Sequence, residues 1–207
     1  MNLTDVTVVK LTPSLVDDYV AFFDNTAHNA SSNHDKCYCI AFCNDDVYHT
    51  GGVNWYDASD QRRAHAIQRV RDGNIQGYLA YHNGNVIGWC NANTKSDCGA
   101  VMDYMRSYNI PVADDPPERK VKFIFCFTVA PTMQGKGVAT KMLEFICQDA
   151  AAEGFDAVEA KSSRIMSSDG FFGPLALYLK NGFTIHAEQG ERLIVHKDLY
   201  RMKKSHG

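Results

Sequence analysis

A glycine-rich turn at residues 134–141, QGKGVATK, carries the clearest chemical signal in the sequence. It follows an apolar, β-prone run and opens a segment whose apolar residues recur at helical spacing. Small residues at positions 135, 137 and 139 let an anion approach the main chain, where free amides and the positive end of a helix would face it. The turn therefore predicts a phosphate site, and a pyrophosphate without a required metal suits it.

Two better-known phosphate motifs do not fit this turn. A nucleotide P-loop requires GxxxxGK followed by Ser or Thr, but no glycine lies five residues before Gly135, and Lys136 is followed by Gly137. The dinucleotide fingerprint GxGxxG also fails, because Thr140 stands where its third glycine should be. An ordinary strand-to-helix connection is the remaining alternative.

A cluster of His34, Cys37, Cys39 and Cys43 contains side chains that bind zinc in other proteins. No second compact pair occurs elsewhere in the sequence, and the cysteines alternate with the period of a strand, which favours buried thiols on one strand face. We therefore expect no metal, with a redox role or substrate contact left open. The odd total of seven cysteines argues against a disulfide framework.

The elements that must position the turn follow from apolar spacing and turn residues. In the first half we expect a strand and helix in DVTVVKLTPSLVDDYVAFFDNTA, a helix in ASDQRRAHAIQRVRDG, a hairpin around Asn83-Gly84 and a short helix in CGAVMDYMRSYN. In the second half we expect a strand over 121–130, a helix over about 137–153, a strand in FDAVEAKS, a short helix in PLALYLKN and a hairpin around Gln189-Gly190.

Composition predicts one α/β or α+β domain over residues 1–207. The chain is 45% hydrophobic, which is sufficient for one good core. A net charge of −3 gives no basic surplus for nucleic acid. Apolar runs are too short to span a bilayer, and the N-terminus lacks a charged-then-apolar leader, so we expect a soluble, cytoplasmic protein without a membrane partner.

In this context the sequence resembles the GNAT superfamily of acyl-coenzyme A-dependent N-acyltransferases. The family pattern of a strand ending in V-x-P, then Arg or Gln, then xxGxG or xxGxA, is matched by VAP at 129–131 and QGKGVA from Gln134. The family continues with a strand and an LYxxxGF element, here LYLKNGF at 177–183. The resemblance covers roughly residues 78–197, and residues 28–77 match only loosely.

The resemblance implies a GNAT-type fold, with a mixed, mostly antiparallel sheet that splays near residues 129–134 and helices on both faces. It implies acetyl-coenzyme A as co-substrate and direct transfer of its acetyl group to a primary amine of a small molecule or peptide. The pantetheine arm would pair with the main chain of Phe127, Thr128 and Val129. Amides of the turn would bind the pyrophosphate, at Gln134, Gly135, Lys136, Gly137, Val138, Ala139 and Thr140. The Lys136 side chain is equally consistent with a phosphate contact and with a solvated surface lysine.

The resemblance also implies that Tyr178 is the general acid, since a phenol is still protonated at neutral pH, and that an amide near Val129 polarises the thioester carbonyl. The alternative for Tyr178 is a core aromatic on a short helix. Glu159 is the best candidate for the general base, against a surface or ion-paired glutamate, and His186 and Glu188 are weaker candidates.

One position departs from the family pattern. Phe171 stands where many members have an asparagine about seven residues before the tyrosine, and Ser162 or Ser163 is a substitute for its polar contact. This departure and the unassigned base keep a second class of function open, a non-catalytic acyl-coenzyme A-binding or sensing module. Acceptor contacts are expected from the first helix and its following loop, the 107–118 loop and the closing hairpin. A homodimer is compatible with the sequence.

Overall fold

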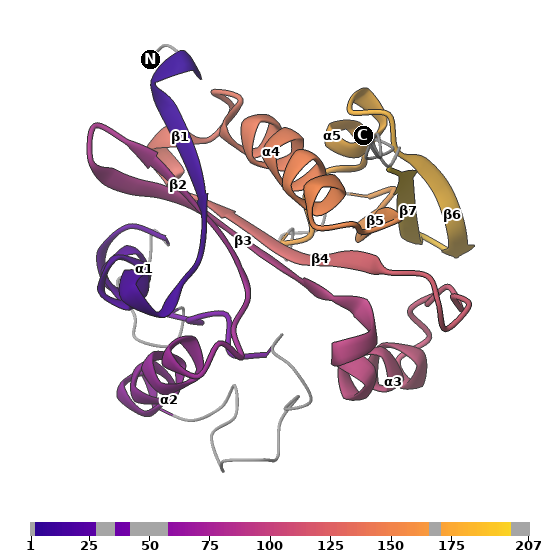
Figure 1. Cartoon of the computed structure of the whole chain (residues 1–207), viewed down its shortest axis with the longest axis horizontal. Helices are drawn as coiled ribbons and strands as arrows, with labels where there is room; N and C mark the ends of the chain where they lie inside the picture. Colours follow the sequence, from indigo (N-terminus) through magenta and orange to yellow (C-terminus); the bar gives the residue numbers. More distant parts are fainter. Residues whose placement is uncertain (1–2, 28–35, 42–57, 166–170, 200–207) are drawn as a thin grey trace, which may run out of the picture.

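A computed structural model of the protein describes residues 3–27, 36–41, 58–165 and 171–199. In this part of the chain seven strands form one sheet in the order β1-β2-β3-β4-β5-β7-β6 (Figure 1). The strands are β1 (Val6–Lys10), β2 (Gly77–His82), β3 (Asn85–Thr94), β4 (Val121–Val129), β5 (Ala157–Ser163), β6 (Thr184–Gln189) and β7 (Arg192–Asp198). Neighbouring strands are antiparallel except β4 and β5, which are parallel. The mixed, mostly antiparallel sheet of the sequence analysis is confirmed.

Helices cover both faces of this sheet, as predicted. They are α1 (Val16–Asn25), α2 (Ser59–Arg71), α3 (Gly99–Ser107), α4 (Val138–Ala152) and α5 (Leu175–Lys180). α4 runs along one face, where Met142 and Leu143 are fully buried. α1 and α2 cover the other face near β2 and β3, and α3 covers it near β4 (Figure 1). Among the helices of the described ranges, none combines the length and apolar character needed to cross a membrane.

The β2–β3 hairpin confirms the turn predicted from Asn83-Gly84. Their φ angles are 50° and 75°, and a tight two-residue hairpin turn of type I′ requires positive φ at both central residues. The hairpin pairs Tyr81 with Val86 and His82 with Asn85. It places β3 beside β4, the strand that leads into the glycine turn.

β4 contains an extra residue at the centre of the sheet. Asn91 of β3 pairs with Cys126, but the next residue, Ala92, pairs with Ile124, so Phe125 has no partner on β3. A bulge of this kind bends its strand and changes the face toward which side chains point. As a result, the Phe125 ring and the Cys126 thiol both lie on the face covered by α1 and α3.

β4 and β5 separate at this same point. Their last pair is Ile124 with Ala160, although β4 continues to Val129 and β5 to Ser163. We predicted the splay near residues 129–134, but it begins directly after Ile124, because the bulge bends β4 there. The second half of β4 therefore has an open edge toward β5.

Residues 37–41 form a turn, which corrects the predicted strand with alternating cysteines. Tyr38 and Cys39 have φ of 46° and 49°, in the left-handed region that no strand uses. Cys37 and Cys39 are nevertheless buried, as expected for thiols that act as small hydrophobes. The other two members of the suggested metal cluster, His34 and Cys43, lie outside the described residues.

Candidate functional site

The glycine turn joins β4 to α4 through one short 3-10 turn, Pro131–Met133. Gly135 and Gly137 have φ of 71° and 84°, a conformation that glycine adopts without the strain a Cβ would bring. The Gln134 side chain folds back, and its Nε2 donates to the Val129 carbonyl at 3.1 Å. This bond ties the turn to the end of β4.

α4 begins without a side-chain cap. Its N-cap residue is Gly137, and the first helical bond runs from the Lys141 N–H to the Gly137 carbonyl at 3.0 Å. The amides of Val138, Ala139 and Thr140 precede this bond, so the helix itself gives them no acceptor. With the positive end of the helix dipole, they form a site for an anion.

A groove of about 420 Å³ lies against these amides. This volume lies within the usual range for small-molecule sites. One wall is the turn and the start of α4, and the other is α5 with the residue before it. The lining residues are Val129, Met133, Gln134, Gly135, Gly137, Val138, Ala139, Thr140, Pro174, Ala176, Leu177 and Lys180. Most of the predicted turn residues therefore line one groove. Lys136 is exposed and is not among the lining residues, whereas Lys180, which the sequence analysis missed, places a cation at its edge.

Tyr178 is fully buried beside the open edge of β4. Its ring packs against Phe183 and Phe127, with ring centres 5.4 and 6.4 Å away. Its hydroxyl donates to the Phe172 carbonyl at 2.6 Å. Burial raises the pKa of the Tyr178 phenol well above its usual value of 10, so the hydroxyl keeps its proton at every ordinary pH.

The main chain of β4 meets Tyr178 at Phe127. The Phe127 N–H points into the splay and donates to the Phe171 carbonyl at 2.7 Å. Thr128 lies on the opposite face of the sheet, with its hydroxyl 3.5 Å from Cys126 Sγ. The structure thus brings Phe127, Val129, the turn and Tyr178 around one edge, and it directs the Thr128 side chain away from them.

Glu159, the candidate base, lies in a buried ion network on the α3 face. Its side chain is 0% exposed. Its Oε2 accepts from Lys95 Nζ at 2.7 Å, and its Oε1 lies 3.1 Å from His196 Nδ1. Asp115 bonds the same Lys95 ammonium at 2.5 Å, and Asp198 lies 3.0 Å from His196 Nε2. Both oxygens of Glu159 are engaged by neighbours that hold it in place.

The two weaker base candidates also lie apart from the turn. His186 stacks on His196, with ring centres 4.9 Å apart, and Glu188 forms an exposed ion pair with Arg164 at 2.5 Å. Lys95 and His196 were not among the site residues predicted from the sequence. Strand register pairs Glu159 with His196, and the only sequence signal for this is that both lie in β-prone runs.

The cysteine turn lies against the same face of the sheet. Asn91 Nδ2 donates to Cys39 Sγ at 3.3 Å, and Asn93 Nδ2 donates to Asn91 Oδ1 at 2.6 Å. Within the described ranges, no three His, Cys, Asp or Glu side chains are placed to hold a metal ion.

Comparison with known proteins gives one family and many similar folds. A family model described as the acetyltransferase (GNAT) family matches residues 40–183, well over half of the chain. No curated protein matches the sequence.

Three solved structures illustrate the likeness in fold. An acetyltransferase of the GNAT family from Streptococcus pneumoniae has a TM-score of 0.54 at 14% identity, covering 94% of this chain and 99% of that chain. The paiA N-acetyltransferase from Thermoplasma acidophilum, in complex with coenzyme A, has a TM-score of 0.51 at 13% identity, covering 93% and 98%. A putative acetyltransferase from Salmonella typhimurium, solved with its cofactor acetyl-CoA, has a TM-score of 0.50 at 15% identity, covering 96% of both chains. At these identities the likeness concerns the fold.

Proposed function

Because the chain belongs to the GNAT acetyltransferase family, we propose that it transfers the acetyl group of acetyl-coenzyme A directly to a primary amine. The observation that carries this proposal is the groove at the uncapped start of α4. Its position, between the glycine turn and the helix that holds Tyr178, brings a site for an anion and a proton donor to the same edge of β4.

Two parts of the groove suit two parts of coenzyme A, the pyrophosphate and the pantetheine arm. Amides of residues 134–140 would bind the pyrophosphate, and glycines with positive φ allow it to approach the main chain. Apolar walls from Val129, Met133, Pro174 and Leu177 would contact the pantetheine arm. This arrangement requires no metal, because the turn itself supplies the donors.

The proposed reaction uses two hydrogen-bond donors. As the amine attacks the thioester carbon, negative charge grows on the carbonyl oxygen. We place its donor at the Phe127 N–H, two residues before the amide near Val129 that the resemblance suggested, because this N–H points into the splay. The carbon–sulfur bond then breaks, and the Tyr178 hydroxyl would give its proton to the leaving thiolate. The amine must lose one proton for the products to be neutral amide and free thiol.

We do not assign this last proton to Glu159, because Lys95 and His196 already engage both of its oxygens. Lys161 of β5 is a better base candidate. Its Nζ lies 3.5 Å from the centre of the Phe172 ring, next to the residues that surround Tyr178. Burial lowers the pKa of Lys161 to about 8, so a useful fraction of this amine is neutral at slightly alkaline pH.

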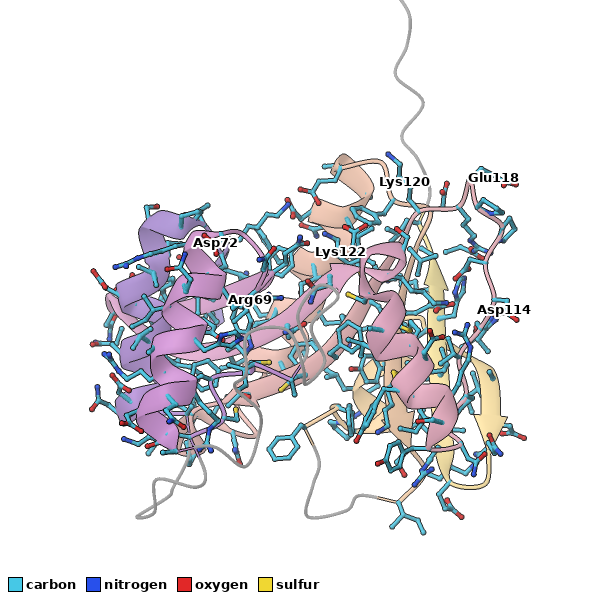
Figure 2. The ribbon with its side chains drawn as sticks, turned by 90° about the horizontal axis from the view of Figure 1, so that it is seen from below. Arg69, Asp72, Asp114, Glu118, Lys120 and Lys122 are labelled. Carbon is cyan, nitrogen blue, oxygen red and sulfur yellow. The ribbon has the colours of Figure 1, made fainter. Side chains whose placement is uncertain are left out.

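The 107–118 loop, one expected source of acceptor contacts, lies at the far end of β4. It lines a hollow of about 270 Å³ that reaches Val121. Figure 2 shows Asp114 and Glu118 along this loop, with Lys120 and Lys122 where it enters β4. Phe127 lies six positions after Val121 along the strand, which is about 20 Å. A small amine cannot touch both ends, so this hollow would serve only an extended acceptor such as a peptide.

The proposal is tested by following coenzyme A release from acetyl-coenzyme A across a panel of polyamines, amino acids and peptides. We expect release above the hydrolysis rate with at least one acceptor class, matched by acetylated product in mass spectra. Tight binding of acetyl-coenzyme A with no release across the whole panel would instead support the non-catalytic acyl-coenzyme A-binding module.

Lys180→Glu is expected to weaken coenzyme A binding about tenfold at low salt, which corresponds to roughly 1.4 kcal/mol. Lys180 lines the groove, so reversing its charge repels the coenzyme's phosphates. Isothermal titration at two ionic strengths measures this effect, which should shrink as salt rises. Lys120→Glu is the matched control, because Lys120 is exposed and directly precedes β4 at its far end, outside the groove lining. Equal losses in both variants would contradict a specific contact by Lys180.

A further inference from the structure

A short segment before α5 already engages the donors that the proposed reaction needs. The main-chain carbonyls of three consecutive residues, Phe171, Phe172 and Gly173, accept from Phe127 N at 2.7 Å, Tyr178 Oη at 2.6 Å and Ser162 Oγ at 3.3 Å respectively. Two of these donors are the groups proposed to contact the thioester oxygen and the leaving sulfur. The 171–173 segment therefore lies along the open edge of β4, where the end of the pantetheine arm would lie.

Further contacts show that this segment fits its place closely. The Phe172 ring lies under the Lys161 ammonium, 3.5 Å from Nζ to the ring centre. Gly173 has φ of 76°, and a Cβ at this position would lie 3.2 Å from the Tyr178 hydroxyl oxygen. Only glycine combines this backbone conformation with so close an approach to the tyrosine.

We propose that the 171–173 segment is an internal competitor of the pantetheine arm, which must leave the splay before acyl-coenzyme A binds in a reactive position. The inference rests on the proposed function, which places the arm at Phe127 and Tyr178. A phenol has one proton to donate, and an N–H makes one good hydrogen bond, so the segment and the arm exclude each other at both donors.

The competition has a measurable consequence for affinity. A ligand whose binding requires a less populated conformation binds more weakly, by the fraction of molecules in that conformation. Coenzyme A would carry this cost because it has the arm. A fragment without the arm, 3′-phosphoadenosine 5′-diphosphate, would bind at the turn alone and would not carry it.

Two adjacent serines provide a matched pair of variants. Ser162 donates to the Gly173 carbonyl, whereas the Ser163 hydroxyl accepts from the Ile165 N–H at 3.3 Å and does not touch the segment. Ser162→Ala removes one hydrogen bond that holds the segment, so it should bind coenzyme A roughly three- to tenfold more tightly. Its affinity for the fragment, and both affinities of Ser163→Ala, should stay at the wild-type values in calorimetric titrations.

Gly173→Ala and hydrogen exchange give independent measurements. The alanine strains the segment and crowds Tyr178, so it should also raise affinity for coenzyme A and not for the fragment. In wild-type protein, amide exchange at residues 171–173, resolved with overlapping peptides, should speed up on adding coenzyme A and stay unchanged with the fragment.

The outcomes separate this inference from the proposed function. Changes of equal size for both ligands, or weaker coenzyme A binding in Ser162→Ala and Gly173→Ala, would overturn the competition while the proposed function stands. If wild-type protein bound neither ligand, the proposed function would fail, and this inference with it.

Discussion

Glu159→Gln is expected to lower the free energy of unfolding by about 3 kcal/mol, the low end of the range for breaking a buried ion pair. The fully buried carboxylate binds Lys95 Nζ at 2.7 Å and lies 3.1 Å from His196 Nδ1. In the variant Lys95 still pairs with Asp115 and His196 still pairs with Asp198, so we expect the loss of stability to stay at the low end of this range. For a chain of this length the melting temperature should fall by roughly 10 °C.

Glu188→Gln is the matched control. Glu188 pairs with Arg164, but these side chains are 57% and 46% exposed, and exposed pairs contribute below about 1 kcal/mol. Turnover per folded molecule should be unchanged in Glu159→Gln, because this carboxylate holds other side chains and does not reach the splay. If Glu159→Gln had the wild-type melting temperature and a turnover reduced about a hundredfold, Glu159 would be assigned as the general base instead.

The same network predicts a pH window for the destabilisation. Burial alone would raise the pKa of Glu159, but hydrogen bonds from His196 and Lys95 lower it below its usual 4.5. This contribution to stability is present above pH 4.5 and is lost as pH falls through the lowered pKa. The hydrogen bond to Glu159 raises the pKa of His196 above 6.5, so its contribution is present below pH 6.5 and is lost as pH rises through the raised pKa. The difference in melting temperature between wild type and Glu159→Gln should therefore be largest between pH 4.5 and 6.5.

Local patterns explain why much of this fold could be predicted from the sequence. Asn83-Gly84 specifies its hairpin because few other residue pairs adopt positive φ at both central positions of the turn. α4 was predicted within one residue at each end, since its apolar positions all face one layer and Gly137 directly precedes its first residue. The glycine turn depends on the same local chemistry, which is why the groove contains most of the residues that the motif suggested.

The remaining features depend on contacts between distant segments. The bulge at Phe125 comes from the register of β4 against β3, and no local pattern in the apolar run VKFIFCFTV marks it. The network around Glu159 requires Lys95, directly after β3, and His196 of β7 to contact the same carboxylate. The turn at 37–41 was mistaken for a strand because alternating cysteines match the period of a strand. In the structure Tyr38 and Cys39 have positive φ, and Cys39 Sγ accepts a hydrogen bond from Asn91, which is distant in the sequence.

Tyr178→Phe is expected to lower turnover about a hundredfold, the usual contribution of one general acid. The hydroxyl is the proton donor that the described residues offer beside Phe127 at the splay. Because burial keeps its pKa well above 10, wild-type activity should show no alkaline loss from this group up to pH 10. Affinity for acetyl-coenzyme A should be nearly unchanged, because the variant loses the Tyr178 bond to the Phe172 carbonyl in the free protein and the Tyr178 bond to the arm in the complex.

Tyr19→Phe separates this catalytic effect from a loss of stability. Tyr19 is equally buried, and its hydroxyl also donates to a main-chain carbonyl, that of Tyr38, at 2.5 Å, but on the α1 face of the sheet. Both variants should lose roughly 1 kcal/mol of stability, the usual contribution of one buried hydrogen bond. Only Tyr178→Phe should lose turnover per folded molecule, measured as initial rates at saturating substrate against the folded fraction from circular dichroism. Equal turnover in the two variants would leave Tyr178 as a core tyrosine, and the leaving thiolate would then take its proton from another group or from water.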